Sequence, residues 1–599
     1  MLSTSSLIIS FQVLITLVTM TLLLGVTKAL RGKRGALSAS LNLNDILILM
    51  LVSCLWVICL TGLHPVWSGV LSFCIGLYGC LIWLDALLFI QYRIEINRQT
   101  LAWCFTGAKG LKKGLPHLFS GLKKLPIATL VVPLWLLFIV VNANGWMQAW
   151  VTSALPHTAL SIGFTIFTLG LTFCLLALII RTKVQPEHAF FSAPTLLLNI
   201  FADDTFDVSP DVAIASAHEH FIQPLTERPT PSSHFGALTG ANIILITVES
   251  LGAYVTPYAQ NAARSRIAER LKNNSWLSEK HFCLCPNTTV STNQMYTGGY
   301  SNNPYNKDDS LFPGTEPKHI ELLKSNGYKT LFLDSADIQL YDYHKLLKRI
   351  GFDKVWGTTD MPANGLQGDY RLLNMVEEVA NTVGSSPFYL HIINDQSHMP
   401  YEVVDKQRFN RHGFADNKSV YLNAIEEVDY IIDTFLKRLG EQVDLSNTAI
   451  VFTGDHGESF GEYGYSFHSN SVINAQVQVP FMLHHPKLSA KTMEHSCHFD
   501  LFPTFFDLLG IDCPYPTLGK SLAFDNRDFA YFFHSATLKG NSPANFGFML
   551  DGDMIWMDRL FNQVNHIHNG QQRQKVSTDQ KRYSKTLLHM MLKSRGVLA

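Results

Sequence analysis

The chain has 599 residues, too many for one ordinary domain, and its 47 Lys and Arg residues almost balance its 48 Asp and Glu residues. This balance argues against the strongly basic composition that is typical of nucleic-acid-binding proteins. Only 16% of the residues are charged, and the mean hydropathy of +0.12 is high for a soluble protein. We therefore expect part of the chain to lie in a membrane.

The high hydropathy comes from the first third of the chain. Five apolar runs there approach or exceed the roughly 20 residues that cross a hydrocarbon core. They are Leu7–Leu24, Leu43–Leu63, Trp67–Ile90, Leu125–Val141 and Ala159–Ile180. We predict a membrane domain of five helices over residues 1–181. A cleaved signal peptide is not expected, because no basic residue precedes the first run and no small-residue cleavage site lies nearby.

The basic residues of the loops predict on which side of the membrane the C-terminal part lies. Basic residues gather in the loops 28–34 and 91–124, and with five spans both loops lie on the side of the large C-terminal part. Counting positive charges alone would place that part in the cytoplasm.

Residues 182–239 are predicted to form an interfacial helix and a linker. The apolar run 190–201 could lie along a bilayer surface. The stretch "TERPTPSSHFG" (226–236) is rich in Pro and Ser, which argues against regular structure there.

From residue 240 onward, short β-rich runs alternate with helical stretches. The predicted strands are 242–248, 329–334, 387–393, 448–454 and 480–484. The predicted helices are 316–325, 419–439 and 499–509. Continuous apolar strands separated by amphipathic helices indicate an α/β doubly wound, mostly parallel sheet, which we assign to residues 240–540. Beyond about Asp528 the sequence predicts short strands. Residues 541–599 are predicted to hold small strands and a basic tail helix from about Tyr583.

Ten cysteines divide unevenly between the two parts of the chain. Six lie in the membrane third, and the other four are Cys283, Cys285, Cys497 and Cys513. An even number permits disulfides without specifying a pairing. The chain has no CxxC pair or Cys/His array that would indicate a zinc finger.

Three of the predicted strands end in polar residues. Glu249 follows 242–248, Asp455 and His456 follow 448–454, and a loop with His398 follows 387–393. In an open parallel sheet, sites lie beyond the carboxyl ends of the strands. Two carboxylates and an imidazole from different strands would suit Zn²⁺ or Mn²⁺. Taken singly, each could also be a cap, a turn residue or a structural histidine.

A nucleophile is expected in the hydroxyl-rich segment "CLCPNTTVSTNQMYTGGYSNNP", residues 283–304. A Thr hydroxyl reacts poorly at neutral pH unless a base or a metal lowers its pKa. A metal held by Glu249, Asp455 and His456 would have that effect. The alternative for any one of these hydroxyls is an ordinary loop hydrogen bond.

Several segments resemble the motifs of the alkaline phosphatase/sulfatase superfamily. They are "ITVES", the Thr-rich segment, "QSHMPY", "GDHGESFGEYGYSFH" and "HFDLFPTFFDLLGI". Within that superfamily the chain is most similar to a membrane-anchored group with five spans and a catalytic domain outside the cell membrane. The group includes the lipid A phosphoethanolamine transferases and the lipoteichoic acid synthases. The resemblance covers most of residues 240–540.

The resemblance implies one catalytic zinc ion, or manganese as in the glycerol-phosphate enzymes, with a second ion possible. Its ligands would be Glu249, Thr289, Asp455 and His456. Thr289 would also be the nucleophile, because it lies four residues after Cys285, and Thr288 is its competitor.

His398 and His468 match the histidines that bind the substrate phosphate in this group. His468 also keeps the spacing of twelve residues from His456. The chain departs from the phosphoethanolamine enzymes at Met295, where they have a second Cys, and at "SHMPY", where Ser-His-Gly-Pro is usual. These departures leave the acceptor and the head group open.

The implied function is metal-dependent transfer of phosphoethanolamine from phosphatidylethanolamine, through a phospho-Thr intermediate, to an envelope lipid or glycan such as lipid A. The alternatives are glycerol-phosphate transfer from phosphatidylglycerol, sulfatase-like phosphoester hydrolysis and non-catalytic lipid sensing by a membrane protein. The formylglycine type of sulfatase would need a Cys-x-Pro-Ser/Ala-Arg segment, which the chain does not contain.

The resemblance also implies a multi-pass protein of the bacterial inner membrane, with its catalytic domain facing the periplasm or the outside. This placement disagrees with the positive-charge count. The expected partners are a membrane phospholipid donor and an envelope acceptor, with no nucleic acid, and we expect a monomer.

Overall fold

The computed structural model describes two compact units, one of residues 1–102 and 115–205 and the other of residues 103–114 and 206–599. The residues described are 81, 84–85, 88–89, 91–97, 100–101, 228–255, 265–300, 316–525, 532–539, 542–550, 553–560, 563–568, 572–575 and 586. The predicted spans apart from a few residues of the third, the segment 190–201, and the tail helix apart from Thr586 lie outside this set. Among the described residues, no helix has the length and apolarity needed to cross a membrane.

Among the described residues of the first unit, the side chain of Asp85 contacts the backbone eleven residues further along the chain. Asp85, which is 1% exposed, accepts a hydrogen bond from the backbone N–H of Ile96 at 2.7 Å. Arg93 has a φ of 53° and its guanidinium lies 5.3 Å from the ring centre of Phe89. The carboxylate in this apolar run therefore has a structural partner in the segment that follows the helical residues.

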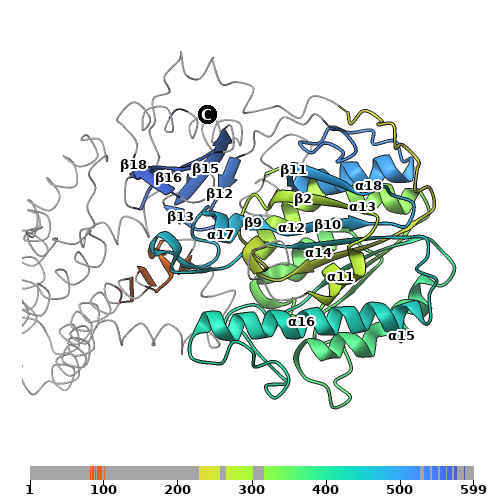
Figure 1. Cartoon of the computed structure of the whole chain (residues 1–599), viewed down its shortest axis with the longest axis horizontal. Helices are drawn as coiled ribbons and strands as arrows, with labels where there is room; N and C mark the ends of the chain where they lie inside the picture. Colours follow the sequence, from red (N-terminus) through yellow and green to blue (C-terminus); the bar gives the residue numbers. More distant parts are fainter. Residues whose placement is uncertain are drawn as a thin grey trace, which may run out of the picture. The chain divides into compact units, whose positions relative to one another are not determined.

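The second unit is built on a nine-stranded sheet with the order β11-β2-β10-β6-β1-β5-β3-β4, and β9 pairs with β2 (Figure 1). Its strands are β1 (Asn242–Val248), β2 (Ser275–Phe282), β3 (Lys329–Asp334), β4 (Lys354–Trp356), β5 (Phe388–Ile393), β6 (Thr448–Gly454), β9 (Gln478–Val479), β10 (Phe481–His484) and β11 (Lys491–Cys497). β1, β3, β4, β5 and β6 run parallel, and β10 is antiparallel to both of its neighbours.

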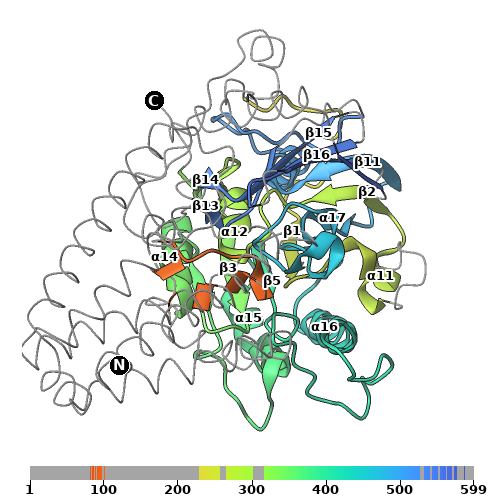
Figure 2. The ribbon, with the colours of Figure 1, turned by 90° about the vertical axis from the view of Figure 1, so that its left-hand side faces the viewer.

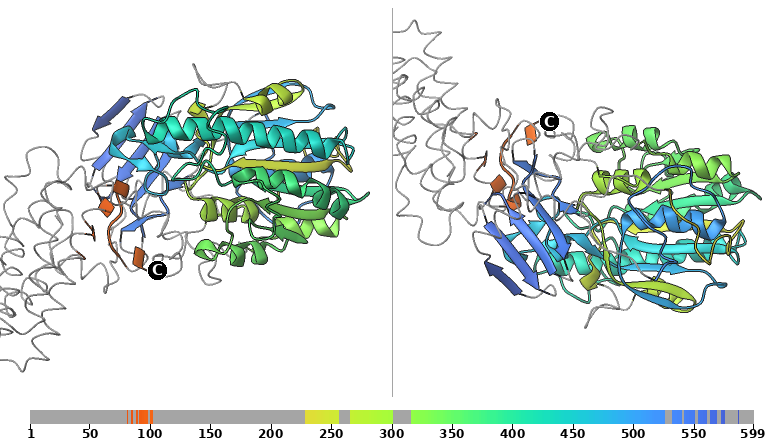
Figure 3. Two further views of the ribbon diagram at one scale, coloured as in Figure 1. Left: turned by 90° about the horizontal axis from the view of Figure 1, so that it is seen from below. Right: turned by 90° about the horizontal axis from the view of Figure 1, so that it is seen from above.

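Helices cover both faces of this sheet. On one face α11 (Arg266–Leu271), α15 (Val376–Val383) and α16 (Asn417–Gly440) pack against Ile244 and Ile246 of β1. On the other face α12 (Thr288–Thr297), α13 (His319–Ser325), α14 (Tyr343–Ile350) and α18 (Leu501–Leu509) pack against Ile243 and Leu245. Neighbouring residues of β1 thus enter different cores, as strand geometry requires. Figure 2 shows α16 end-on below the sheet, and Figure 3 shows the layers from below and above. The α/β doubly wound architecture is confirmed.

A second, antiparallel sheet follows the main domain in the sequence. Its strands are β12 (Phe532–His534), β15 (Asn545–Leu550), β16 (Asp553–Asp558), β17 (Gln563–His568) and β18 (Gln572–Lys575). A shared apolar cluster joins this sheet to the carboxyl end of β2, through residues that include Phe282, Phe533 and Trp556. The short strands expected after about Asp528 are therefore present.

Short elements complete the described part of the second unit. They are β7 (Ser459–Phe460), β8 (Ser466–Phe467), β13 (Leu538–Lys539), β14 (Ser542–Pro543), α17 (Asn474–Val477) and the 3-10 helices η5 (Ala253–Val255), η7 (Leu340–Asp342), η8 (Gly368–Met375), η9 (Glu462–Gly464) and η10 (His498–Asp500). The cysteines left open above, Cys283, Cys285, Cys497 and Cys513, are buried and form no disulfide with one another.

Candidate active site

The site begins at the carboxyl ends of two adjacent parallel strands. β1 and β6 are paired in register, with Val248 opposite Gly454. The residues that follow, Glu249 on one strand and Asp455 with His456 on the other, therefore meet at the same edge of the sheet. Glu249 is 4% exposed, and Asp455 and His456 are fully buried.

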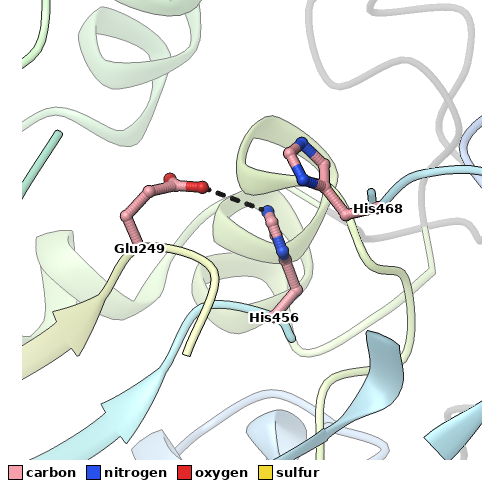
Figure 4. A group of neighbouring side chains, drawn as sticks. All are labelled: Glu249, His456 and His468. Carbon is pink, nitrogen blue, oxygen red and sulfur yellow. Dashed lines mark ion pairs between the residues drawn. The ribbon is translucent and has the colours of Figure 1, made fainter. Parts of the chain in front are cut away.

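Three polar groups converge on the Nε2 atom of His456. This nitrogen lies 3.5 Å from Glu249 Oε1 and 3.3 Å from Asp455 Oδ2. The hydroxyl of Thr288 lies 3.3 Å from the same nitrogen, and it donates a hydrogen bond to Glu249 Oε2 at 3.0 Å. In Figure 4, Glu249 and His456 follow the ends of two strands and point toward each other.

The hydrogen bonds around Asp455 and His456 leave two groups that a cation would satisfy. Asp455 Oδ1 accepts from the backbone N–H groups of Ser250 (2.9 Å) and His456 (2.7 Å), but the buried Oδ2 has no hydrogen-bond partner. His456 Nδ1 lies 3.0 Å from the carbonyl oxygen of Gly457, which can only accept. Nδ1 therefore carries the proton, and the lone pair of Nε2 faces the carboxylates.

Burial gives both groups unusual pKa values. It raises the pKa of Asp455 to about 6 and lowers the pKa of His456 to about 4, the nearby His468 adding to the second effect. A neutral imidazole lone pair beside two carboxylates and a hydroxyl is a nitrogen and oxygen ligand set suited to a divalent metal. The residues present therefore fit a metal ion held by Glu249, Asp455, His456 and Thr288.

Thr288 reaches this centre because it is the first residue of α12. The side chain of Asn287 caps the helix by accepting from the N–H of Val290 at 3.2 Å. The contacts with Glu249 and His456 belong to Thr288, whereas the spacing from Cys285 had favoured Thr289. The threonine whose hydroxyl makes these contacts is therefore the one that the sequence left as the competitor.

His468 enters the site from a different loop, as Figure 4 shows. Its ring lies 4.4 Å from that of His456 and 5.2 Å from that of His398. Glu249, His456 and His468 each offer one ligand atom, and these atoms all lie within 4.8 Å of one another. The two expected phosphate-binding histidines therefore adjoin the strand-end cluster, and His398 is tied by its Nδ1 to the carbonyl of Met399 at 2.8 Å.

The loop holds His468 in a strained setting. Phe467 and Ser469, on either side of it, have φ angles of 67° and 71°. Such left-handed conformations cost free energy in residues with a β-carbon and are concentrated at functional sites. Burial lowers the pKa of His468, but the carboxylates of Glu458 at 3.2 Å, Glu249 and Asp455 together outweigh this and raise it to about 9.

Glu458 is the site residue that the sequence analysis did not single out. It is fully buried, and its Oε1 has no hydrogen-bond partner while Oε2 contacts His468. The available signal was its position in the "DHGES" motif, two residues after His456. Gly457 between them is required by space, because a β-carbon there would collide with the carbonyl oxygen of Ala475.

Comparisons with known proteins agree with this fold. Residues 241–511 match the family model described as Sulfatase. The lipoteichoic acid synthase-like protein YvgJ of Bacillus subtilis is 23% identical over 404 residues, which cover 60% of this chain and 64% of that protein. Lipoteichoic acid synthase of Staphylococcus aureus is 23% identical over 324 residues, which cover 47% of each chain.

Two solved structures are also similar. The lipoteichoic acid synthase LtaP from Listeria monocytogenes has a TM-score of 0.48 and 20% identity, covering 62% of this chain and 96% of that one. A protein of the alkaline phosphatase superfamily from Vibrio parahaemolyticus has a TM-score of 0.49 and 17% identity, covering 66% and 93%. The chain spans about half to two thirds of the length of the curated relatives named above.

Proposed function

Because residues 241–511 form a Sulfatase-family domain, we propose that the protein is a metal-dependent phosphotransferase that acts on a membrane phospholipid. The observation that carries this proposal is the position of Thr288. Its hydroxyl lies within 3.3 Å of His456 and donates a hydrogen bond to Glu249. These two residues follow the ends of the paired parallel strands β1 and β6.

Glu249, Asp455, His456 and Thr288 would hold the metal ion, and the nitrogen and oxygen donors suit Zn²⁺ or Mn²⁺. When bound there, a divalent ion would lower the pKa of the hydroxyl and offset negative charge on the phosphoryl group. The buried, unpartnered Oδ2 of Asp455 supports this assignment.

In the proposed reaction, Thr288 Oγ1 forms a bond to the phosphorus of the donor lipid as its proton passes to Glu249 Oε2, to which it is hydrogen-bonded. The bond from phosphorus to the diacylglycerol oxygen breaks, and this oxygen takes up that proton, so that diacylglycerol departs and the head group stays on Thr288. A hydroxyl of the acceptor then displaces Thr288 from phosphorus, and the acceptor's proton returns to Thr288 Oγ1. His468, held by Glu458, would bind phosphoryl oxygens in both steps, and His398 lies beside it.

For the head group we place glycerol phosphate from phosphatidylglycerol first. Curated relatives that match 47–60% of this chain bear the name lipoteichoic acid synthase, or are described as similar to one. This reverses the order expected from the sequence alone, in which phosphoethanolamine came first and lipid A was the example acceptor. Phosphatidylethanolamine is the alternative donor.

The proposed location follows from the donor. We propose that the catalytic part lies on the outer side of the bacterial cytoplasmic membrane, where an envelope glycan or lipid could serve as acceptor. The five spans, the outward orientation and the monomeric state remain predictions from the sequence.

The test uses the full-length protein reconstituted in vesicles that contain phosphatidylglycerol or phosphatidylethanolamine with a labelled acyl chain. We expect labelled diacylglycerol to form from phosphatidylglycerol, to require added Zn²⁺ or Mn²⁺, and to stop in Thr288→Ala. Mass spectrometry of the head-group product separates transfer from hydrolysis, since a hydrolase releases free glycerol phosphate. Release of diacylglycerol that survives both chelation and Thr288→Ala would overturn the proposal.

A further inference from the structure

His498 is the first residue of η10 and is 1% exposed. It contacts the end of β6, just before Asp455 of the candidate site. Its Nε2 is 3.1 Å from the carbonyl oxygen of Gly454, and its Nδ1 is 3.0 Å from the hydroxyl of Ser291. That hydroxyl also donates to the carbonyl oxygen of Asp455 at 2.7 Å. One imidazole therefore joins strand β6, where it ends at the ligand Asp455, to helix α12.

The protons of this network can be assigned from its acceptors. The carbonyl oxygen of Gly454 can only accept, so Nε2 of His498 carries the hydrogen. Burial lowers the pKa of His498 to about 3, so the ring carries a single proton and Nδ1 is an acceptor. The hydroxyl of Ser291 is consequently shared between Nδ1 and the carbonyl of Asp455, and the ring is bound on both sides in one orientation.

The two elements held in this way are those that carry the reacting groups. Ser291 follows Thr288 by three residues on α12, so the two side chains lie one above the other on neighbouring turns. The carbonyls of Gly454 and Asp455 belong to the peptide groups on either side of the Asp455 α-carbon. A shift of this bridge would change the separation between the Thr288 hydroxyl and the Asp455 carboxylate.

We propose that His498 is a positioning residue, which fixes the nucleophile helix against the metal-ligand strand through Ser291 and the backbone of residues 454–455. The inference rests on the proposed function for its catalytic readout. Its geometric basis is independent of which head group is transferred.

A second buried histidine provides a matched control. His319 is also 1% exposed, and burial lowers its pKa to about 3 as well. Its ring stacks on Phe502 at 4.6 Å, and its Nδ1 bonds the hydroxyl of Tyr515 at 2.9 Å. These partners lie on α18 and the segment after it, so that the loss of His319 disturbs the core without touching β6 or the first turn of α12.

The experiment compares His498→Phe, His498→Gln, Ser291→Ala and His319→Phe in the full-length protein. Calorimetry on chelator-treated protein gives the Kd for Zn²⁺ or Mn²⁺ alone, and donor turnover gives kcat and KM. Groups that orient metal ligands from outside typically contribute about 10- to 100-fold in affinity or activity. For His498→Phe we expect about 10-fold weaker metal binding and about 10-fold lower kcat with KM changed less than about twofold. The amide of Gln should recover part of both losses.

His319→Phe should lower Tm while leaving Kd and kcat unchanged. If His498→Phe behaves in the same way, His498 is only a core residue and the inference is overturned. Should His498→Phe fail to fold, Ser291→Ala decides, because it cuts the same bridge from the helix side; unchanged Kd and kcat there would also overturn it. Absence of phospholipid turnover in the wild type would refute the proposed function, whereas the comparison of metal Kd values would still decide the role of His498.

Discussion

Replacing Thr288 with Ala removes a hydroxyl that contacts both Glu249 and His456. Deleting a catalytic nucleophile typically lowers kcat by about 10⁴- to 10⁶-fold, which corresponds to roughly 5–8 kcal/mol of activation free energy. We expect a loss of this size in donor turnover. The fold should persist, because Asn287 still caps α12 and Ala is well tolerated at the start of a helix.

The metal content should also persist in Thr288→Ala. Glu249, Asp455 and His456 remain, and Glu249 Oε1 keeps its hydrogen bond from Ser250 at 2.7 Å. The variant therefore separates loss of chemistry from loss of the site when turnover, metal content and Tm are measured on the same sample. A fall in metal content equal to the fall in turnover would show instead that Thr288 acts mainly as a ligand.

Thr289→Ala is the matched control, because it changes the adjacent residue in the same helical turn. We expect it to keep turnover within about threefold of the wild type, since the hydroxyl that contacts Glu249 and His456 belongs to Thr288. The reverse result would be an active Thr288→Ala protein and an inactive Thr289→Ala protein. It would refute Thr288 as the nucleophile and support Thr289, which the spacing from Cys285 favours.

Three further perturbations follow from the packing of the site. Asp455→Asn should weaken metal binding by about 100-fold or more in calorimetry, because it replaces a charged ligand oxygen; wild-type affinity would exclude Asp455 as a ligand. Gly457→Ala should lower stability by about 1–3 kcal/mol, since its β-carbon would meet the carbonyl of Ala475, whereas Gly440→Ala, at the end of α16, should be close to neutral in the same thermal scan. Because burial lowers the pKa of His319 from 6.5 to about 3, the unfolded chain binds more protons between these values and stability falls as pH falls. From pH 7 to pH 5 this contributes about 2 kcal/mol, which His319→Phe should remove from the acid loss seen in urea unfolding; an unchanged loss would contradict it.

The central strands could be predicted because each is a continuous apolar run between polar segments. The predicted ranges 242–248, 329–334 and 448–454 are the bounds of β1, β3 and β6, and β5 and β10 each begin one residue later than predicted. These strands are buried on both faces, so their sequences carry the signal in every residue.

β2 and β11 were not predicted, because each strand contains both buried and partly exposed residues. In "SWLSEKHF" of β2 the middle residues are only partly buried, and in "KTMEHSC" of β11 buried residues appear only at the end. Partly exposed strands near one side of a sheet carry polar side chains and lose the apolar signal. Their place in the sheet depends on pairing with distant segments, which no local pattern contains.

The strand-end residues of the candidate site could be predicted from the sequence, but the choice of the candidate nucleophile could not. Glu249, Asp455 and His456 stand at the ends of clear strands, where a parallel sheet must bring them together. The choice between Thr288 and Thr289 depends on where α12 begins and on its rotation about its axis. Both are set by Asn287 and by Ser291, whose hydroxyl contacts Asp455 and His498 across the core.

The candidate site contains groups that lower the stability of the fold around it, and this cost favours a functional role for these residues. A pKa of about 6 for the buried Asp455 means that its ionised form costs about 3 kcal/mol at neutral pH. Left-handed Phe467 and Ser469 add strain of about 1–3 kcal/mol each. The apolar cores on either side of β1 supply stability that offsets these costs, but the packing of these cores does not depend on the charged or strained residues. Local features that oppose the stability of the fold are expected at functional sites. Here they lie at residues next to His456 and His468, whose rings are 4.4 Å apart.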